Sequence, residues 1–587
     1  MEIKLEDKYK LSKGTRFLTG AQALVRVPIV QARRDKQKNL NTACYISGYR
    51  GSPLGGYDQQ ILKNKKYLNE NNIFFQPGIN EELAATSLWG TQQVNLRKQD
   101  KYDGVFGIWY GKGPGVDRAG DALKHVNLAG TSKFGGVIAL MGDDHICESS
   151  TTSHQSEFAM IDAMIPFFNP SGVQEILDYG ILGIELSRKS GCWVGIKCVH
   201  DNVSSGATVD LDENRLNIVD ISNEKYPSEG LNIRLKDTAQ DKEYRLHHHK
   251  IKYVKEFCKI NNLNKIIFDS EKAKVGIIST GKSFLDTKLG LEKIGINEDV
   301  ANQVGIKFLK IAMPWPLEET VIEKFSENLE KIIVVEEKRS IIETQVKEIL
   351  FNKNLNIKVV GKNDENNNDL FVSSGALDPG EIGLKIFEII NYLKLPDEVN
   401  NLSKKLKSLK ENANSNISLK RVPHFCSGCP HNTSTRIPEG SRAITGISCA
   451  YLVEHMERDN EGFSQMGSEG ATWVGESVFS NTDHVFQNMG DGTYIHSGIL
   501  SIRHAVAAKT KMTFKILYND AVALTGGQAL DGLPTVAQMS KQLEAEGVEE
   551  IAIITDEIEK YSDRGGFARN SKIYDRKNII DVQIELS

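Results

Sequence analysis

The chain has 587 residues, a net charge of −5 and eight cysteines. This length suits about three or four domains, and the apolar content of 40% is ordinary for a globular protein. The acidic balance, without zinc-finger, RNP or basic-zipper signatures, excludes nucleic acid as an expected partner. Because the chain has neither a long apolar run nor a leader pattern, we expect no membrane span and a cytoplasmic location. In this setting the cysteines favour free thiols or metal ligands over disulfides.

The first block, residues 11–233, has the pattern of a parallel α/β sheet. Short apolar runs end at glycines and are followed by helical patterns. The predicted strands are Thr42–Ser47, Val105–Tyr110, Gly136–Met141 and Trp193–Val199. Such alternation predicts one sheet covered by helices on both faces.

The rest of the chain is predicted to form four further segments. Residues 234–273 form a helical connection, 274–395 a second α/β domain, 396–420 a polar connecting helix or linker, and 421–587 a third α/β domain. The expected strands of the two domains are Lys274–Ser279, Phe308–Ala312, Lys331–Val335, His484–Asn488, Met512–Tyr518 and Glu550–Thr555. The fold class is therefore α/β with several parallel-sheet, three-layer domains.

Two turns of the third domain combine into the strongest functional pattern. Asp491, in Gly490-Asp491-Gly492, follows one predicted strand, and Asn519 follows the next, with a predicted helix at 497–508 between them. A right-handed crossover makes the strands parallel, so both turns lie at the carboxyl edge of the sheet, where ligands bind. Carboxylate and amide oxygens suit Mg²⁺, and glycines let phosphates approach the backbone. The alternative is that Gly-Asp-Gly is a plain turn.

A Gly-Asp-Gly followed further along by an Asn resembles the pattern of thiamine-diphosphate enzymes. Tyr518 stands where that pattern has a first Asn. The resemblance implies that Asp491, Asn519 and the carbonyl of Ala521 bind Mg²⁺. The residues expected around the cofactor are Gly490, Asp491, Gly492, Asn519, Ala521, Thr525 and Gly526; no chemical step is assigned to Thr525.

Longer motifs resemble the indolepyruvate ferredoxin oxidoreductases, a family of 2-oxoacid:ferredoxin oxidoreductases, and most closely their fused bacterial form. The motifs are ISGYRGSPLGGYD at 46–58, GINEELAAT at 78–86, WYGKGPGVD at 109–117, FCSGCPHNT at 425–433, NMGDGTYIHSG at 488–498 and YNDAVALTGGQ at 518–528. The resemblance implies a pyrimidine-binding domain at 11–233, a transketolase C-terminal-like domain at 274–395 and a diphosphate- and Mg-binding domain at 421–587. The fused proteins continue into a ferredoxin-like segment, so this chain corresponds to their N-terminal half.

Glu81 and Glu82 are candidates for the acid that activates the cofactor. Both begin a predicted helix, and a buried carboxyl with a raised pKa suits hydrogen bonding to the aminopyrimidine. The resemblance implies that Glu81 has this role; the alternative is that both acids complement a helix N-terminus. By the same resemblance Ser52 corresponds to a Thr that binds the substrate's carboxylate or keto oxygen. An ordinary Ser-Pro turn is the alternative.

Cys426, Cys429 and Cys449 form a second pattern. Three thiolates are one short of a tetrahedral zinc site or a 4Fe–4S cluster. The resemblance implies an iron–sulfur cluster, with a probable 4Fe–4S composition, whose fourth ligand is not identified. Zinc at the Cys426–Cys429 pair is the alternative.

The resemblance implies oxidative decarboxylation of an aryl 2-oxoacid, of the indolepyruvate type, to the acyl-CoA. Expected partners are the 2-oxoacid, coenzyme A and ferredoxin, in a homodimer, with a separate ferredoxin-domain or gamma-type subunit as a further candidate. Two alternatives stay open. One is a non-oxidative thiamine-dependent decarboxylase that needs no cluster; the other is a catalytically incomplete, cofactor-binding subunit that needs a ferredoxin-domain partner.

Overall fold

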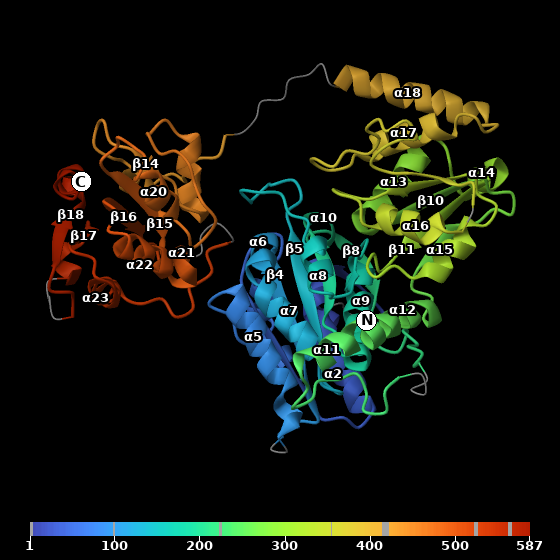
Figure 1. The fold of residues 1–587 in the computed structure, drawn as a ribbon, viewed down its shortest axis with the longest axis horizontal. Coiled ribbons are helices and arrows are strands. Elements are labelled where there is room, and N and C mark those ends of the chain that lie inside the picture. The colour runs from blue at the N-terminus through green and yellow to red at the C-terminus, as the bar shows by residue number, and fades with distance from the viewer. Residues whose placement is uncertain are drawn as a thin grey trace. The chain divides into compact units, whose positions relative to one another are not determined.

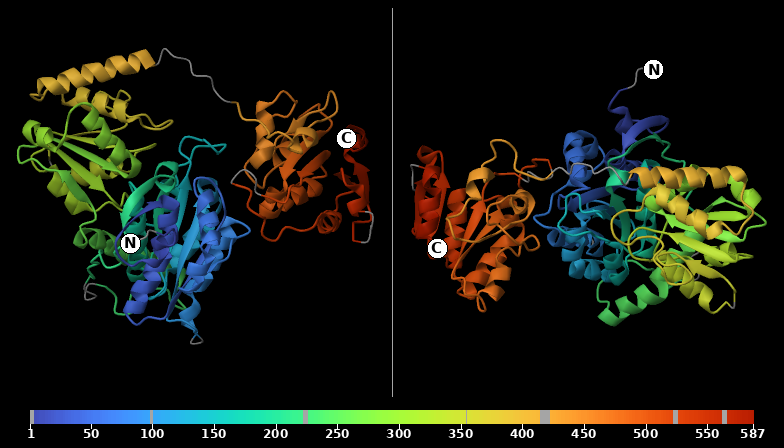
Figure 2. Two further views of the ribbon diagram at one scale, coloured as in Figure 1. Left: turned by 180° about the vertical axis from the view of Figure 1, so that it is seen from behind. Right: turned by 90° about the horizontal axis from the view of Figure 1, so that it is seen from above.

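The computed structural model describes residues 4–97, 100–221, 226–353, 355–413, 422–521, 526–561 and 566–587. The chain forms two compact units, Met1–Ile417 and Ser418–Ser587, and both are built of helices around parallel strands (Figures 1 and 2). Within the described ranges, every helix is too short or too polar to cross a bilayer. The predicted α/β class with several parallel sheets is confirmed.

A six-stranded parallel sheet forms the centre of the first unit, in the order β3-β2-β4-β5-β7-β6. The strands are β2 (Thr42–Gly48), β3 (Ile73–Phe75), β4 (Gly104–Lys112), β5 (Val137–Asp143), β6 (Phe167–Phe168) and β7 (Val194–Val199). The four strands predicted for this block are confirmed, with ends that differ by one or two residues.

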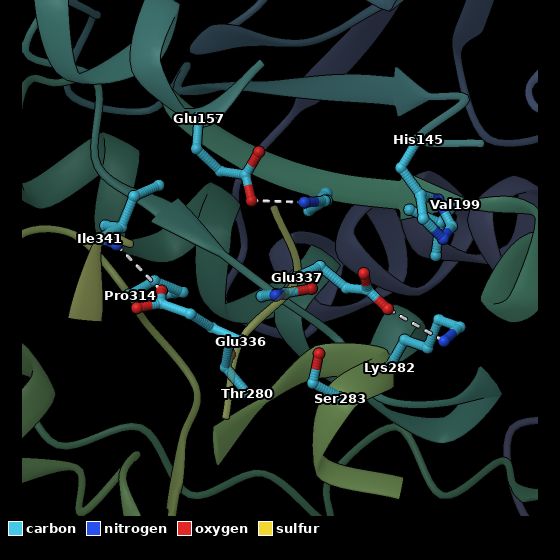
Figure 3. A pocket seen from close by; sticks show the side chains of 12 residues that line it. His145, Glu157, Val199, Thr280, Lys282, Ser283, Pro314, Glu336, Glu337 and Ile341 are labelled. Carbon is cyan, nitrogen blue, oxygen red and sulfur yellow. Dashed lines mark hydrogen bonds and ion pairs between the residues drawn. The ribbon is translucent and has the colours of Figure 1, made fainter. Parts of the chain in front are cut away.

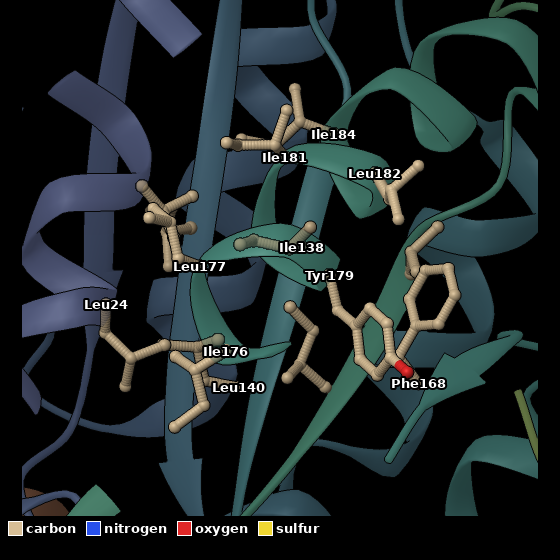
Figure 4. Close-up of a cluster of buried hydrophobic side chains, with 14 of the residues drawn as sticks. Leu24, Ile138, Leu140, Phe168, Ile176, Leu177, Tyr179, Ile181, Leu182 and Ile184 are labelled. Carbon is tan, nitrogen blue, oxygen red and sulfur yellow. The ribbon is translucent and has the colours of Figure 1, made fainter. Parts of the chain in front are cut away.

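The two faces of this sheet support two separate cores. Alternate side chains of a strand point to opposite faces, so Ile138 and Leu140 of β5 join one core and Ala139 joins the other. The helices α2 (Gly20–Gln37) and α9 (Val173–Ser190) cover the first face (Figure 4), and α5 (Glu81–Gln92) and α7 (Gly120–Ala129) cover the second. Burial on both faces explains why these strands are continuous apolar runs.

Asp35 on α2 and Arg188 on α9 form a buried ion pair. The two guanidinium nitrogens donate to the two carboxylate oxygens at 2.7 Å each, and the hydroxyl of Thr42 donates to Oδ2 at 2.7 Å. Both charged side chains are almost fully enclosed. A pair with this bidentate geometry offsets the desolvation of both charges.

A second sheet in the first unit has the order β13-β12-β10-β11-β9 and is parallel except at the β9 edge. Its strands are β9 (Lys265–Phe268), β10 (Val275–Thr280), β11 (Ile306–Ile311), β12 (Lys331–Val335) and β13 (Lys358–Val360). One face packs against α13 (Gly281–Lys293) and α17 (Pro379–Ile390), and the other against α15 (Glu319–Ser326) and α16 (Ile342–Phe351). Val399, on α18 (Asp397–Ala413), joins the first of these cores.

Strand ends of both sheets surround a polar cavity in the first unit (Figure 3). Its lining includes residues at or just after the carboxyl ends of β5, β7, β10, β11 and β12, among them His145, Val199, Thr280, Pro314 and Glu337. Its lysines are paired inside the protein: Lys197 bonds to Glu157, and Lys282 bonds to Glu337 at 3.1 Å. The cavity therefore lies at strand ends of both sheets, each lysine is paired with an acid of its own sheet's block, and no sequence-predicted site residue lines the cavity.

The second unit has a parallel sheet in the order β14-β15-β16 and a parallel pair, β17-β18. The strands are β14 (Ala443–Ile444), β15 (Val485–Gly490), β16 (Met512–Leu517), β17 (Ile551–Thr555) and β18 (Ser571–Asp575). Between β15 and β16 the chain is helical through α21 (Asp491–Thr493), a π-helical turn (Tyr494–Gly498) and α22 (Ile499–Ala507). The predicted start of this helix at Ser497 is wrong, because helical geometry begins at Asp491, directly after the strand.

We predict that Arg188→Met destabilises the first unit by about 3–5 kcal/mol, because it leaves the Asp35 carboxylate buried without its partner charge. Chemical denaturation followed by circular dichroism measures the loss. The double variant Asp35→Asn/Arg188→Met removes the unpaired charge and should recover part of it. A cost below about 1 kcal/mol for Arg188→Met, the level of an exposed pair, would contradict this account.

Candidate active site

The two turns that follow β15 and β16 meet at Asp491. Oδ2 of Asp491 accepts the backbone N–H groups of Asn519 at 2.9 Å and Asp520 at 2.7 Å, and Oδ1 accepts the N–H of Gly492 at 2.8 Å. Asp491 is 3% exposed. Burial raises the pKa of Asp491, and the backbone hydrogen bonds from the two turns oppose that rise. The carboxylate is therefore held in one orientation at the carboxyl edge of the sheet.

The second turn exposes the other predicted metal ligands. Asn519 is exposed and Ala521 half-buried, and the N–H of Ala521 donates to the amide oxygen of Asn519 at 3.2 Å. Asp520, between them, has a left-handed backbone with φ +57°. Gly526 is exposed, and Thr525 lies outside the described residues. A carboxylate, an amide oxygen and a backbone carbonyl thus come from one edge, as a hard divalent cation requires.

The helix that begins at Asp491 points its first turn toward the same edge. Its Ncap residue, Gly490, provides no side-chain cap, and a Cβ added at Gly490 would meet no atom of the described residues within 4 Å. The first N–H groups of a helix lack intrahelical partners and favour anions. This arrangement has free space and N–H donors where a diphosphate would be held.

Glu469 is a buried acid beside this helix that the sequence analysis missed. It is fully enclosed, with 0% exposure. Oε2 accepts the N–H of Gly467 at 2.7 Å. Burial raises the pKa of Glu469 to about 7, although N–H groups, including that of Ile447, and the nearby hydroxyl of Thr493 oppose the rise. Its only sequence signal is a pair of flanking glycines, which is typical of an exposed turn.

In the first unit, Glu81 is the first residue of α5 and is 6% exposed, whereas Glu82 is exposed. The indole N–H of Trp109 donates to the Glu81 carbonyl at 3.0 Å. The Glu81 carboxyl lies against Gly115, where an added Cβ would come within 2.4 Å of Oε1. Of the two candidate acids, only Glu81 has the enclosure that a cofactor-activating carboxyl needs.

Three motifs of the first block converge at the carboxyl ends of β2 and β4. The N–H of Gly78 donates to the carbonyl of Gly48 at 2.9 Å. The segment that leads into Glu81 therefore lies beside the end of β2. A Cβ added at Gly51 would lie 2.9 Å from the Lys112 side chain at the end of β4. Half-buried Ser52 follows Gly51 directly. Ser52 and Glu81 therefore belong to one edge of this sheet.

The three predicted cluster ligands lie near one another in the second unit. The N–H of Cys429 donates to the Cys426 carbonyl at 3.1 Å. Burial, and then the charges of Cys429 and Cys426, raise the pKa of Cys449. Across the described ranges, however, no three His, Cys, Asp or Glu side chains are arranged as a set of metal ligands. Of the remaining cysteines Cys147 is exposed, and the others are buried in cores: Cys44, Cys192, Cys198 and Cys258.

Two family models match separate parts of the chain. Residues 265–416 match the indolepyruvate oxidoreductase domain, and residues 449–554 match the C-terminal TPP-binding domain of thiamine pyrophosphate enzymes. The second match contains both Asp491 and Asn519. The second unit is therefore a thiamine-diphosphate-binding domain.

Similarity to known proteins extends over nearly the whole chain. The indolepyruvate oxidoreductase subunit IorA of Methanothermobacter marburgensis is 25% identical over 567 residues, which cover 94% of this chain and 82% of that protein. IorA of Pyrococcus horikoshii is 26% identical, over 88% of this chain and 76% of that protein. A solved 2-oxoglutarate:ferredoxin oxidoreductase from Magnetococcus marinus superposes with a TM-score of 0.46 at 12% identity, covering 64% of this chain and 66% of that one.

These matches describe an α/β chain that contains a thiamine-diphosphate-binding domain. Over most of its length the chain is similar to indolepyruvate oxidoreductase subunits, and residues 265–416 match the indolepyruvate oxidoreductase domain. The two relatives named above are single subunits.

We predict that Glu469 makes stability fall as pH rises. Its folded pKa, about 7, lies above the ordinary value of 4.5, so the unfolded state ionises first and stability is lost between these two values. The Gln side chain of Glu469→Gln cannot ionise. The free energy of unfolding of this variant should therefore exceed that of the wild type by up to about 3 kcal/mol at pH 8 and differ little from it at pH 4. Calorimetric melting at both pH values measures this; equal curves for both proteins would contradict the burial of a titrating acid.

Proposed function

We propose that the chain is the thiamine-diphosphate-binding subunit of an enzyme that oxidatively decarboxylates an aryl 2-oxoacid of the indolepyruvate type. The reaction takes the 2-oxoacid and coenzyme A to the acyl-CoA and carbon dioxide, and two electrons go, one at a time, to ferredoxin. The meeting of two strand-end turns at Asp491 is the observation that carries the proposal. The family relationship supports the substrate class.

The diphosphate end of the cofactor is assigned to the second unit. Asp491, Asn519 and the carbonyl of Ala521 would hold Mg²⁺, and the first turn of the helix after Gly490 would donate N–H groups to the diphosphate. Support comes from the hydrogen bonds that fix Asp491 and from the open space at Gly490. When bound, thiamine diphosphate supplies an electron sink for the bond to the departing carboxylate.

The aminopyrimidine end is assigned to the carboxyl edge of β2 and β4. Glu81 would hydrogen-bond to the pyrimidine ring through its enclosed carboxyl. Ser52, on the same edge, would donate a hydrogen bond to the substrate's carboxylate or keto oxygen. The enclosure of Glu81 against Gly115, in contrast to Glu82, supports the choice of acid.

Cys426, Cys429 and Cys449 are proposed to hold an iron–sulfur cluster, of 4Fe–4S type, that passes electrons to ferredoxin. Their mutual proximity supports a shared centre. With three thiolates here, we propose that the fourth ligand comes from a partner subunit of ferredoxin-domain or gamma type. A homodimer is proposed for the chain itself, by analogy with the family.

The three-cysteine set also favours a second candidate, in which the chain binds the cofactor but reduces no acceptor until the partner is present. Anaerobic reduction of a viologen dye by the purified chain separates the two. The assay contains Mg²⁺, thiamine diphosphate and coenzyme A, and compares indolepyruvate with pyruvate. Reduction with indolepyruvate supports the complete enzyme, and cofactor binding without reduction supports the incomplete subunit. Decarboxylation by iron-free protein would instead identify a non-oxidative decarboxylase.

We predict that Asp491→Ala weakens binding of Mg²⁺ and thiamine diphosphate by more than roughly 100-fold, because it removes a metal ligand rather than a supporting group. Isothermal titration calorimetry measures the affinity. The matched control is Asp520→Asn, an exposed acid whose backbone, not side chain, contacts Asp491. Full affinity in Asp491→Ala would remove the metal assignment.

For Glu81→Gln we expect a loss of roughly 10²–10⁴-fold in turnover, the usual contribution of a positioned proton donor. Affinity for thiamine diphosphate should change little, because the diphosphate is assigned to the other unit. Glu82→Gln, at the exposed neighbouring position, should retain activity. Steady-state rates of both variants are the measurement. An active Glu81→Gln would show that Glu81 only complements the N-terminus of its helix.

A further inference from the structure

The turn that contains Glu469 is pressed onto the helix that begins at Asp491. Gly467 has φ +89°, and a Cβ there would lie 1.8 Å from the hydroxyl of Ser497 on that helix. Gly470, also at φ +89°, lies against Phe514 of β16, where an added Cβ would come within 2.7 Å of the ring. Only glycine fits at either position, so the backbone of the turn packs directly against both the helix that begins at Asp491 and β16.

This close fit places the Glu469 carboxyl beside Thr493, in the first turn of the helix. The hydroxyl of Thr493 lies close enough to affect the carboxyl's ionisation. Yet in the part of the chain that the structure describes, neither Oε1 of Glu469 nor Oγ1 of Thr493 has a hydrogen-bond partner of good geometry. Both side chains are buried, at 0% and 1% exposure. The Thr493 hydroxyl carries a proton that it can donate to the carboxyl, and an unpaired buried acceptor is costly, so a contact between the two groups is favoured.

The other carboxyl oxygen faces donors from two backbone segments. Oε2 accepts the N–H of Gly467 at 2.7 Å, and the N–H of Ile447 also points at the carboxyl. Ile447 precedes Cys449 by two residues. One side chain therefore contacts the turn at Gly467, the segment that leads to Cys449 and the helix at Thr493.

We propose that Glu469 is a positioning residue for the cofactor: its buried carboxyl bonds to the Thr493 hydroxyl and to the N–H groups of Gly467 and Ile447, and so fixes the first helical turn in the orientation that binds the diphosphate. This deepens the proposed function and rests on its assignment of the diphosphate to that turn. The acid acts through this turn and is assigned no contact with the cofactor. Its effect is on cofactor affinity.

Two substitutions at Glu469 test whether the hydrogen bonds or the charge matter. A Gln can donate to Thr493 through its amide N–H and accept from Gly467 through its carbonyl, so Glu469→Gln should bind thiamine diphosphate within about threefold of the wild type. Glu469→Ala, which lacks both contacts, should weaken binding by roughly tenfold or more. Isothermal titration of the full-length chain with thiamine diphosphate in Mg²⁺ is the measurement. Ser468→Ala, in the same turn, is the matched control and should bind normally.

The opposite side of the contact gives an independent test, which also covers the case that Glu469→Ala fails to fold. Thr493→Val removes the hydroxyl at nearly constant volume and should weaken binding as Glu469→Ala does, while Thr493→Ser should bind normally. The double variant Glu469→Ala/Thr493→Val should be no weaker than either single variant, because the two share one interaction.

Three outcomes would overturn the proposal: wild-type affinity in both Glu469→Ala and Thr493→Val, a loss in Glu469→Gln equal to that in Glu469→Ala, or full additivity in the double variant. A wild-type chain that does not bind thiamine diphosphate at all would instead overturn the diphosphate assignment itself. Melting curves of each variant show that any loss occurs in folded protein.

Discussion

The candidate site depends on one constraint, the hydrogen bonds between the Asp491 carboxylate and the backbone of two chain turns. Parallel pairing of β15 and β16 brings the turns to the same edge, and the N–H groups of Asn519 and Asp520 then converge on one carboxylate oxygen. These hydrogen bonds hold the carboxylate in one orientation: Oδ2 accepts two N–H groups, and Oδ1, which accepts one, keeps a lone pair for a cation. Because the donors are backbone groups, the orientation depends on strand register and helix start rather than on other side chains.

The parallel sheets were predictable because their strands are buried on both faces. Runs such as Val137–Asp143 are apolar at successive positions and end at glycine or at the first polar residue, so strand existence and order in the chain follow from local pattern. The site followed from the same logic, since two polar residues placed after successive parallel strands must share an edge. The groups that fix Asp491 could not be predicted, since they are backbone N–H groups, which nearly every residue has and which carry no sequence signal.

The start of the helix after β15 shows where local pattern fails. Gly490-Asp491-Gly492 has low helix propensity, which favoured a loop up to Ser497. In the structure Asp491 is the first helical residue, where an acid is favoured by the helix dipole, and the turn is held by Met489 and Gly498 packing inside the unit. Tertiary contacts therefore override propensity. Glu469 was missed for a related reason: an acid between two glycines is typical of an exposed turn, and only the close approach of Gly467 to Ser497 encloses it.

Two carboxyls beside one helix thus have different surroundings. Asp491, at the first helical residue, receives three backbone N–H bonds at 2.7 to 2.9 Å, which stabilise its charged form against burial. Glu469 is fully enclosed and has one oxygen with no donor among the described residues, and burial raises its pKa to about 7, which favours the neutral form below that pH. If both were charged, the second carboxylate would repel the diphosphate that the first is meant to hold through a cation. In its neutral form the buried Glu469 carboxyl can bond to Thr493 without adding negative charge next to the turn that is proposed to bind the diphosphate.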